Sequence, residues 1–193
     1  VDHCFSGFVM TILFVRRAFA VLALTVLAST VHAQDVHMAK ALRILRTTPL
    51  VDGHNDLPWY IRSDFKAAPH DVDAYDLRKP TEGNTDIARL RKGMVGGQFW
   101  SVYVPGDIQK SLTLNGVAGP GMSPVTATLE QIDIVHRMVA KYPETLELAL
   151  TADDIVRIQK SGKIASLIGM EGGQSIDGSL GVPRDMYRLG ARY

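Results

Sequence analysis

Val51-Asp-Gly-His-Asn-Asp56 is the stretch that most decides the fold and the site, because a short apolar run here ends in a His-x-Asp pair. We expect a strand from Pro49 to Gly53. Residues two apart on a strand point to the same side, so the side chains of His54 and Asp56 can converge on one metal ion. One nitrogen and one oxygen ligand suit a zinc-type catalytic site. The pair alone is common by chance, so the rest of the chain must support it.

Downstream, apolar and β-branched runs predict three further strands, at Gly97–Val104, Leu146–Leu150 and Lys163–Met170. Helical patterns cover residues 36–46, 85–92, 123–141, 151–160 and 183–189. This alternation predicts a mainly parallel α/β sheet, since right-handed crossovers return each strand beside the last.

The number of strands bears on the architecture. An eight-stranded (β/α)₈ barrel needs ~250 residues, and the pattern reaches Tyr193 just where a fifth strand is due. We therefore expect an N-terminal half of about four βα units of a metal-dependent hydrolase barrel. A small open sheet is the alternative.

Local signals define two of the predicted helices. The longest, Ser123–Lys141, carries an apolar stripe at helical spacing. The stripe consists of Leu129, Ile132, Val135, Met138 and Val139. Thr151 and Asp154 form a capping-box pattern at the start of the next helix. Pro183 is expected in the first turn of the last one.

The N-terminus is typical of an export signal. Arg16 and Arg17 precede the apolar run Ala18–Ala28, and cleavage is expected after Ala33. This run falls short of the ~20 residues of a membrane span. If translation starts at Met10, residues 1–9 are an upstream extension. We thus expect an exported protein, periplasmic or secreted, with a signal at residues 1–33 and a single barrel domain from residue 34 to 193.

The balance of charge argues against some partners. The chain has 21 basic and 20 acidic side chains. Such a chain lacks the basic surplus that nucleic acids and anionic membranes select, so neither is an expected partner.

A second acidic motif, Met170-Glu171-Gly172-Gly173, ends the fourth predicted strand. Catalytic groups of parallel α/β folds collect at the carboxyl ends of strands, so Glu171 is expected on the same rim as His54 and Asp56. A carboxylate can bridge two metals ~3.5–4 Å apart, a role that suits Glu171. Taken singly, His54 could be a buried histidine bonded to a loop carbonyl, Asp56 a helix cap and Glu171 a solvated rim residue.

Three other residues are considered for a substrate contact or a structural role. Trp59 lies close enough in sequence to the metal pair to line a substrate pocket, although tryptophan is more often a core residue. His70 lies in a predicted loop and His136 on the longest helix, and both are expected to be structural or solvated.

Three separated blocks resemble the membrane (renal) dipeptidase family of zinc peptidases. They are Leu50-Val-Asp-Gly-His-Asn-Asp-Leu-Pro-Trp59, Gly93-Met-Val-Gly-Gly-Gln-Phe-Trp-Ser-Val-Tyr-Val-Pro105 and Gly169-Met-Glu-Gly-Gly-Gln-Ser-Ile-Asp177. The resemblance implies a (β/α)₈ barrel with two zinc ions that hydrolyses dipeptides. By the match of motifs, His54 and Asp56 would hold the first zinc and Glu171 would bridge both. A metal-bound hydroxide would attack the peptide carbonyl.

The chain also departs from the family pattern. Gln174 stands where a histidine is usual, Pro183 replaces an aliphatic residue, and Ala191 replaces a larger one. The resemblance places the second zinc's histidines, an acid/base aspartate and a substrate-contacting histidine beyond Tyr193, so this chain alone is expected to be inactive.

Two other functions remain open on the same barrel. One is an exported non-catalytic binding protein, and the other is a metal-dependent hydrolase of different amides or esters. The oligomeric state, a homodimer included, is also left open.

Overall fold

The computed structural model describes residues 36–64, 70–108 and 122–193, in two units that comprise residues 1–47 and 48–193. In the first unit, residues 36–47 form a largely exposed helix, which confirms the helix predicted at 36–46. The predicted export signal and its extension lie outside the described residues. Within the described ranges, no helix has the length and apolar character needed to cross a membrane.

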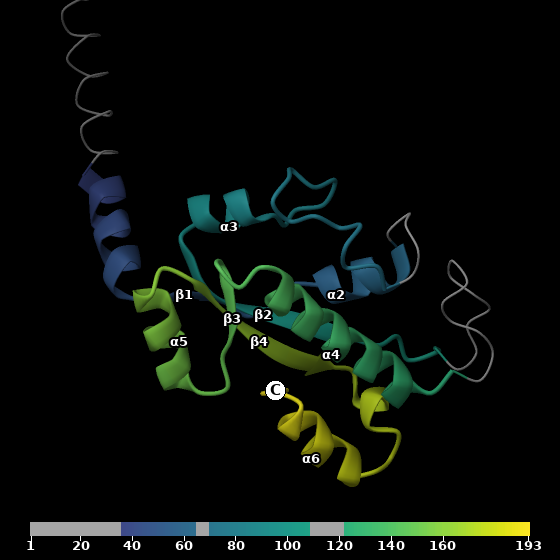
Figure 1. Cartoon of the computed structure of the whole chain (residues 1–193). Helices are drawn as coiled ribbons and strands as arrows, with labels where there is room; N and C mark the ends of the chain where they lie inside the picture. The colour runs from purple at the N-terminus through teal and green to yellow at the C-terminus, as the bar shows by residue number, and fades with distance from the viewer. Residues whose placement is uncertain (1–35, 65–69, 109–121) are drawn as a thin grey trace, which may run out of the picture. The chain divides into compact units, whose positions relative to one another are not determined.

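The second unit is built on a sheet of four parallel strands (Figure 1). They are β1 (Leu50–Asp52), β2 (Val95–Tyr103), β3 (Leu146–Leu148) and β4 (Ile164–Glu171). β2 and β4 form the centre, paired from Gly97 beside Ala165 to Tyr103 beside Glu171. Both are largely buried, as their continuous apolar runs predict for parallel strands covered on both faces. All four predicted strands are therefore present.

The order of the strands is β1-β2-β4-β3, which differs from the expectation that each strand lies beside its predecessor. β3 is only three residues long and pairs with the first residues of β4, Ile164–Ser166. Further along the same edge of β4, Ala191 bridges Ile168, and the N–H of Met170 donates to the carbonyl of Tyr193 at 2.7 Å. Because β3 is so short, two segments of the chain share one edge of β4.

Among the described residues, seven helical segments connect the strands or follow them. They are α2 (Leu57–Trp59), the π-helical η1 (Tyr60–Asp64), α3 (Ile87–Lys92), α4 (Pro124–Lys141), α5 (Ala152–Lys160), the 3-10 segment η2 (Gly173–Ile176) and α6 (Gly181–Arg188).

Side-chain caps begin α4 and α5, and the cap of α5 is the capping box predicted from the sequence. The Ser123 side chain accepts the N–H of Val125 at the start of α4, and Thr151 forms the full capping box with Asp154 at the start of α5. Pro183 lies in the first turn of α6. The predicted apolar stripe of α4 is wrong at Leu129. This side chain is 41% exposed, because it lies outside the face of α4 that packs against the core.

The two faces of the sheet have different covers. Trp100 and Ile168 belong to the main core cluster with residues of α4, whereas Phe99 and Leu167 belong to a second cluster with residues of α5. Since neighbouring strand residues point to opposite faces, α4 and α5 cover opposite faces. α5 reaches the amino-terminal half of its face, near Gly97. The carboxyl-terminal half of that face carries the groups described next.

Candidate metal centre

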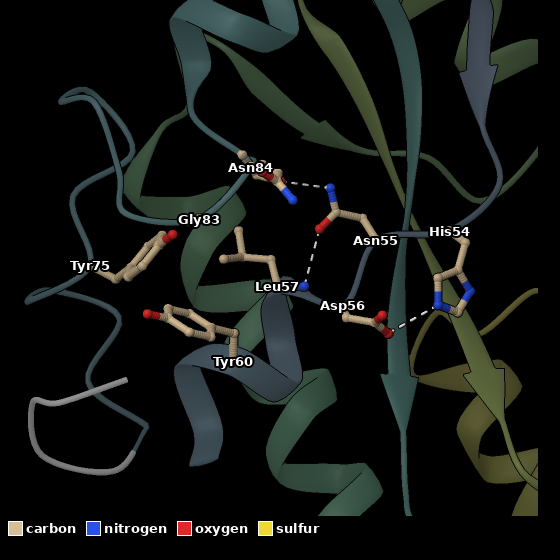
Figure 2. Close-up of a pocket in the computed structure, with 9 residues that line it drawn as sticks. His54, Asn55, Asp56, Leu57, Tyr60, Tyr75, Gly83 and Asn84 are labelled. Atoms are coloured by element: carbon tan, nitrogen blue, oxygen red, sulfur yellow. Dashed lines mark hydrogen bonds and ion pairs between the residues drawn. The ribbon is translucent and has the colours of Figure 1, made fainter. Parts of the chain in front are cut away.

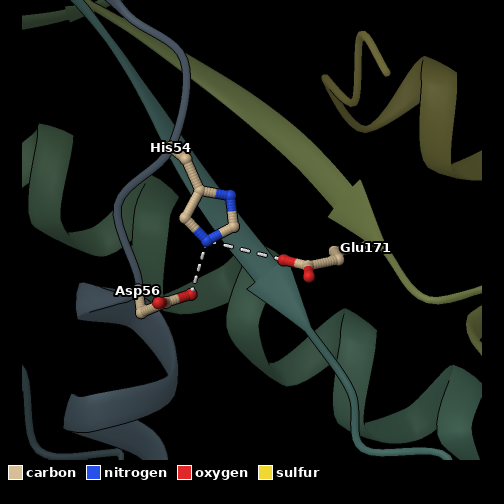
Figure 3. Close-up of side chains that lie close together, drawn as sticks. All are labelled: His54, Asp56 and Glu171. Atoms are coloured by element: carbon tan, nitrogen blue, oxygen red, sulfur yellow. Dashed lines mark hydrogen bonds and ion pairs between the residues drawn. The ribbon is translucent and has the colours of Figure 1, made fainter.

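Three predicted side chains meet at the carboxyl end of the sheet (Figure 3). His54 and Asp56 follow β1, and Glu171 is the last residue of β4, so the two strands that flank β2 supply them. Nε2 of His54 lies 3.0 Å from Oδ1 of Asp56 and 3.5 Å from Oε2 of Glu171. One ligand atom from each residue lies within 4.8 Å of the others.

The loop after β1 leaves both of its ligands free for this purpose. Asp56 occupies the N-cap position of α2, but its side chain makes no capping hydrogen bond. Asn55 caps the helix and fastens the loop instead. Its Oδ1 accepts the N–H of Leu57 at 3.1 Å, and its carbonyl accepts the N–H of Ser101 at 2.9 Å. His54 is about half exposed, so it is not the buried histidine of the alternative interpretation.

Ser101 orients Glu171. Its buried hydroxyl donates to Oε2 of Glu171 at 3.1 Å, and Oε2 is the oxygen that faces His54. The second carboxylate oxygen points away from His54 (Figure 3). One oxygen of Glu171 is thus directed at the His54 ring, and the other is turned away from it.

The donor set fits a zinc-type ion. Two ligand atoms at about 2.1 Å from a tetrahedral ion lie about 3.4 Å apart, close to the 3.0 and 3.5 Å found here. Within the part of the chain that the structure describes, His54 is the only ion-pair partner of Asp56 and Glu171.

Tyr193 lies across the same end of the sheet. Its hydroxyl donates to the carbonyl of Gly53 at 2.6 Å, and its ring packs against Phe99 with centroids 4.9 Å apart. Burial, followed by the charges of Glu171, Asp52 and Asp56, raises the pKa of this tyrosine. The hydroxyl therefore keeps its proton and remains a hydrogen-bond donor at neutral pH.

A cavity of about 370 Å³ opens beside the metal group (Figure 2). It is lined by His54, Asn55, Asp56, Leu57, Tyr60, Tyr75, Gly83, Asn84 and Thr85. The rings of Tyr60 and Tyr75 meet edge to face, with centroids 5.6 Å apart. Because His54 and Asp56 belong to both the cavity and the metal group, a molecule in the cavity can reach the metal position.

The predicted substrate contact Trp59 is not among the residues that line this cavity. It packs edge-on against Tyr103, with centroids 5.8 Å apart, and Arg62 lies 5.4 Å above its ring. It also contacts the small core cluster of Val104, Ile108 and Ala127. A role of Trp59 in substrate binding stays a prediction.

The remaining polar residues singled out from the sequence make structural contacts. The side-chain amide of Gln174 donates to the carbonyl of Val104, which ties η2 to the end of β2. His136 bonds the carbonyl of Leu189 at 2.8 Å. His70 lies 3.6 Å from the carboxylate of Glu130, and burial lowers its pKa. None of the three touches the metal group.

Sequence reasoning missed Ser101, Tyr193 and the two cavity tyrosines. Ser101 had a usable signal, because it is a polar residue within a buried strand, two residues before its end. Tyr193, Tyr60 and Tyr75 had none, since their positions depend on how distant segments pack.

Fold and site together define an α/β protein with a candidate metal centre at the carboxyl ends of parallel strands. The sequence model described as Membrane dipeptidase (Peptidase family M19) matches residues 38–193, and the chain belongs to this family. Dipeptidase verJ of Clonostachys rogersoniana is 43% identical over 157 residues, which cover 81% of this chain and 39% of that protein. Dipeptidase 3 of Mus musculus is 46% identical over 154 residues, 80% of this chain and 28% of that protein. The chain thus spans well under half the length of these relatives.

Solved structures show the same fold. A metallo peptidase from Rhodobacter sphaeroides, liganded with a phosphinate mimic of the dipeptide L-Ala-D-Ala, has a TM-score of 0.58 at 21% identity, over 76% of this chain and 44% of that one. The dipeptidase AC has a TM-score of 0.58 at 24% identity, over 76% of this chain and 41% of that one. The four-stranded parallel sheet is therefore part of the barrel expected from the sequence.

Proposed function

We propose that the complete protein is a zinc-dependent dipeptidase with a dinuclear site, and that this chain supplies the first part of its barrel. The observation that carries the proposal is the convergence of His54, Asp56 and Glu171 beside the cavity. Relatives named dipeptidases at 43% and 46% identity support the reaction and the substrate class. The substrate would be a dipeptide.

The residues of this chain divide the work. His54 and Asp56 would hold the first ion, and Glu171 would be shared between this ion and a second one. Bound zinc supplies a Lewis acid that polarises the peptide carbonyl and activates water. Ser101 keeps Glu171 in place by its hydrogen bond. The rings of Tyr60 and Tyr75 give the cavity an apolar wall that shields a bound peptide from solvent.

The test begins with extension of the reading frame past Tyr193 and expression of the full mature protein. Zinc content and hydrolysis of a small dipeptide panel are then measured together. We expect about two zinc ions per chain and loss of hydrolysis in His54→Ala and in Glu171→Ala. His136→Ala and Glu144→Ala are the matched controls, because neither residue touches the metal group.

The outcomes separate the competing functions. A folded protein with neither metal nor hydrolysis would replace the proposal by a non-catalytic binding protein on the same barrel. A protein that binds zinc but cleaves only other amides or esters would keep the metal centre and change the substrate class.

We also propose that the protein is exported, on the sequence pattern of residues 1–33. Expression in a bacterial host, followed by intact mass measurement of the exported protein, tests this directly. We expect a mature chain that begins at Gln34. A full-length N-terminus in the cytoplasm would contradict export.

A further inference from the structure

Tyr193 has no role in the proposed reaction, yet it bonds next to two of the metal-binding residues. Its hydroxyl reaches the carbonyl of Gly53, the residue before His54, at 2.6 Å. Its main-chain carbonyl accepts the N–H of Met170, the residue before Glu171, at 2.7 Å. One residue therefore bonds directly beside a ligand on β1 and beside a ligand on β4.

The sheet holds the His54 segment by few bonds, whereas Glu171 on β4 pairs directly with Tyr103 on β2. β1 pairs with β2 through three residues only, with an irregular register between Leu50 and Val51. After Asp52, the described main-chain bond from the loop to the sheet is the one that Asn55 accepts from Ser101. The N–H of the peptide between Gly53 and His54 donates locally to Oδ1 of Asp52 at 3.3 Å, and the carbonyl of the same peptide accepts from the Tyr193 hydroxyl, which comes from a distant segment.

The ring of Tyr193 packs between Gly169 on β4 and Phe99 on β2. A Cβ atom at Gly169 would overlap the tyrosine ring, so the glycine makes room for it on β4. Phe99 on β2 packs against the other part of the ring. Gly169 pairs with Ser101, which bonds Glu171. The glycine that makes room for the ring and the serine that orients the carboxylate are therefore neighbours in the sheet.

We infer that Tyr193 is a positioning residue that fixes the separation between His54 and Glu171, and thereby sets the metal affinity and geometry of the centre. This inference rests on the proposed metal centre. It assigns Tyr193 no contact with substrate or metal. Groups that orient metal ligands typically change metal affinity by 10–100-fold when removed, and the Tyr193 hydroxyl acts on His54 through the adjoining peptide.

The test measures metal binding of the full-length protein, without reference to hydrolysis. Zinc affinity is determined by competition with a chromophoric chelator for the parent, Tyr193→Phe and the control Tyr187→Phe, which removes a hydroxyl from an exposed ring on α6. We expect Tyr193→Phe to bind zinc about 10-fold more weakly and Tyr187→Phe to match the parent. Cobalt substitution gives a second readout, because a displaced His54 changes the visible absorption bands of the bound ion.

A second variant keeps the inference testable if Tyr193→Phe folds poorly. Gly169→Ala retains the hydroxyl but takes the space of the ring, so it should weaken zinc binding in the same way. In the double variant the two losses should not add, since both remove one interaction. Unchanged zinc affinity and cobalt spectrum in a folded Tyr193→Phe would overturn the role of Tyr193 alone. Absence of metal binding in the parent would overturn the metal centre as well.

Discussion

Tyr142 offers a sharp test of how the cavity wall is held. Its hydroxyl is buried, accepts the N–H of Leu77 at 2.9 Å and donates to the carbonyl of Tyr75 at 3.3 Å. These bonds anchor the segment that carries Tyr75, one wall of the cavity, to the end of α4. Tyr142→Phe removes both bonds and leaves the packing of the ring intact.

The magnitude follows from burial. A buried N–H that loses its partner costs about 1–3 kcal/mol, and the longer bond to Tyr75 adds about 0.5 kcal/mol. We expect Tyr142→Phe to lower the free energy of unfolding by about 2–3 kcal/mol. Contacts of Arg78 and Lys141 with the ring face remain, since phenylalanine keeps the ring.

Two assays check this prediction. Urea unfolding gives the change in stability, and native-state hydrogen exchange gives the protection of the Leu77 amide, which should fall about 30-fold for a loss of 2 kcal/mol. Tyr187→Phe, at an exposed position, serves as the control and should change stability by less than about 0.5 kcal/mol. If Tyr142→Phe and the control unfold at the same urea concentration, the assignment of Tyr142 as an anchor is wrong.

Three further predictions concern charges and ligand support. Glu130→Gln should lower the unfolding midpoint in urea more than Glu144→Gln, because Glu130 binds the fully buried guanidinium of Arg62 at 2.6 Å, whereas the pair of Glu144 with Arg78 is exposed. Bonds from Arg157, Thr151 and Leu150 lower the pKa of Asp154 from 3.8 to about 2, so its share of stability is present above about pH 4 and is lost as the pH falls towards 2. Acid titration of Asp154→Asn should therefore lack this part of the decline, and parallel titration curves for parent and variant would contradict it. Ser101→Ala should weaken zinc binding about 10-fold by releasing Glu171, while Ser179→Ala, on the exposed turn before α6, should not; equal affinities would remove Ser101 from the support of the centre.

Local sequence patterns predicted the parts of the fold that depend on neighbouring residues. The capping box of Thr151 and Asp154, Pro183 in the first turn of α6 and the four strands were all confirmed, since each depends on residues close in sequence. The predicted order, with each strand beside its predecessor, was wrong, because hydrophobic periodicity does not tell a central strand from a three-residue edge strand such as β3.

The candidate centre was predictable for a different reason. Parallel strands bring their carboxyl ends to one edge, so the residues that follow β1 and the residue that ends β4 were expected on the same edge. The spatial convergence of His54, Asp56 and Glu171 agrees with that rule. Tyr75 and Tyr193 escaped prediction because each reaches the site from a segment distant in sequence, through packing that no short pattern records.

The shared edge of β4 has a consequence for how this fold can vary. β3 and the residues after α6 lie end to end along that edge, so the excursion from β3 through α5 is fastened at the end of the sheet remote from His54 and Glu171. Changes of length in the exposed turn at residues 161–162 can be absorbed without displacing the ligands, although the positive φ of Gly162 (+81°) favours glycine at that position. A single residue inserted near Ala191 would instead shift Tyr193 out of register with Met170. The connection from β3 through α5 can therefore vary in length, whereas the number of residues between α6 and Tyr193 is fixed.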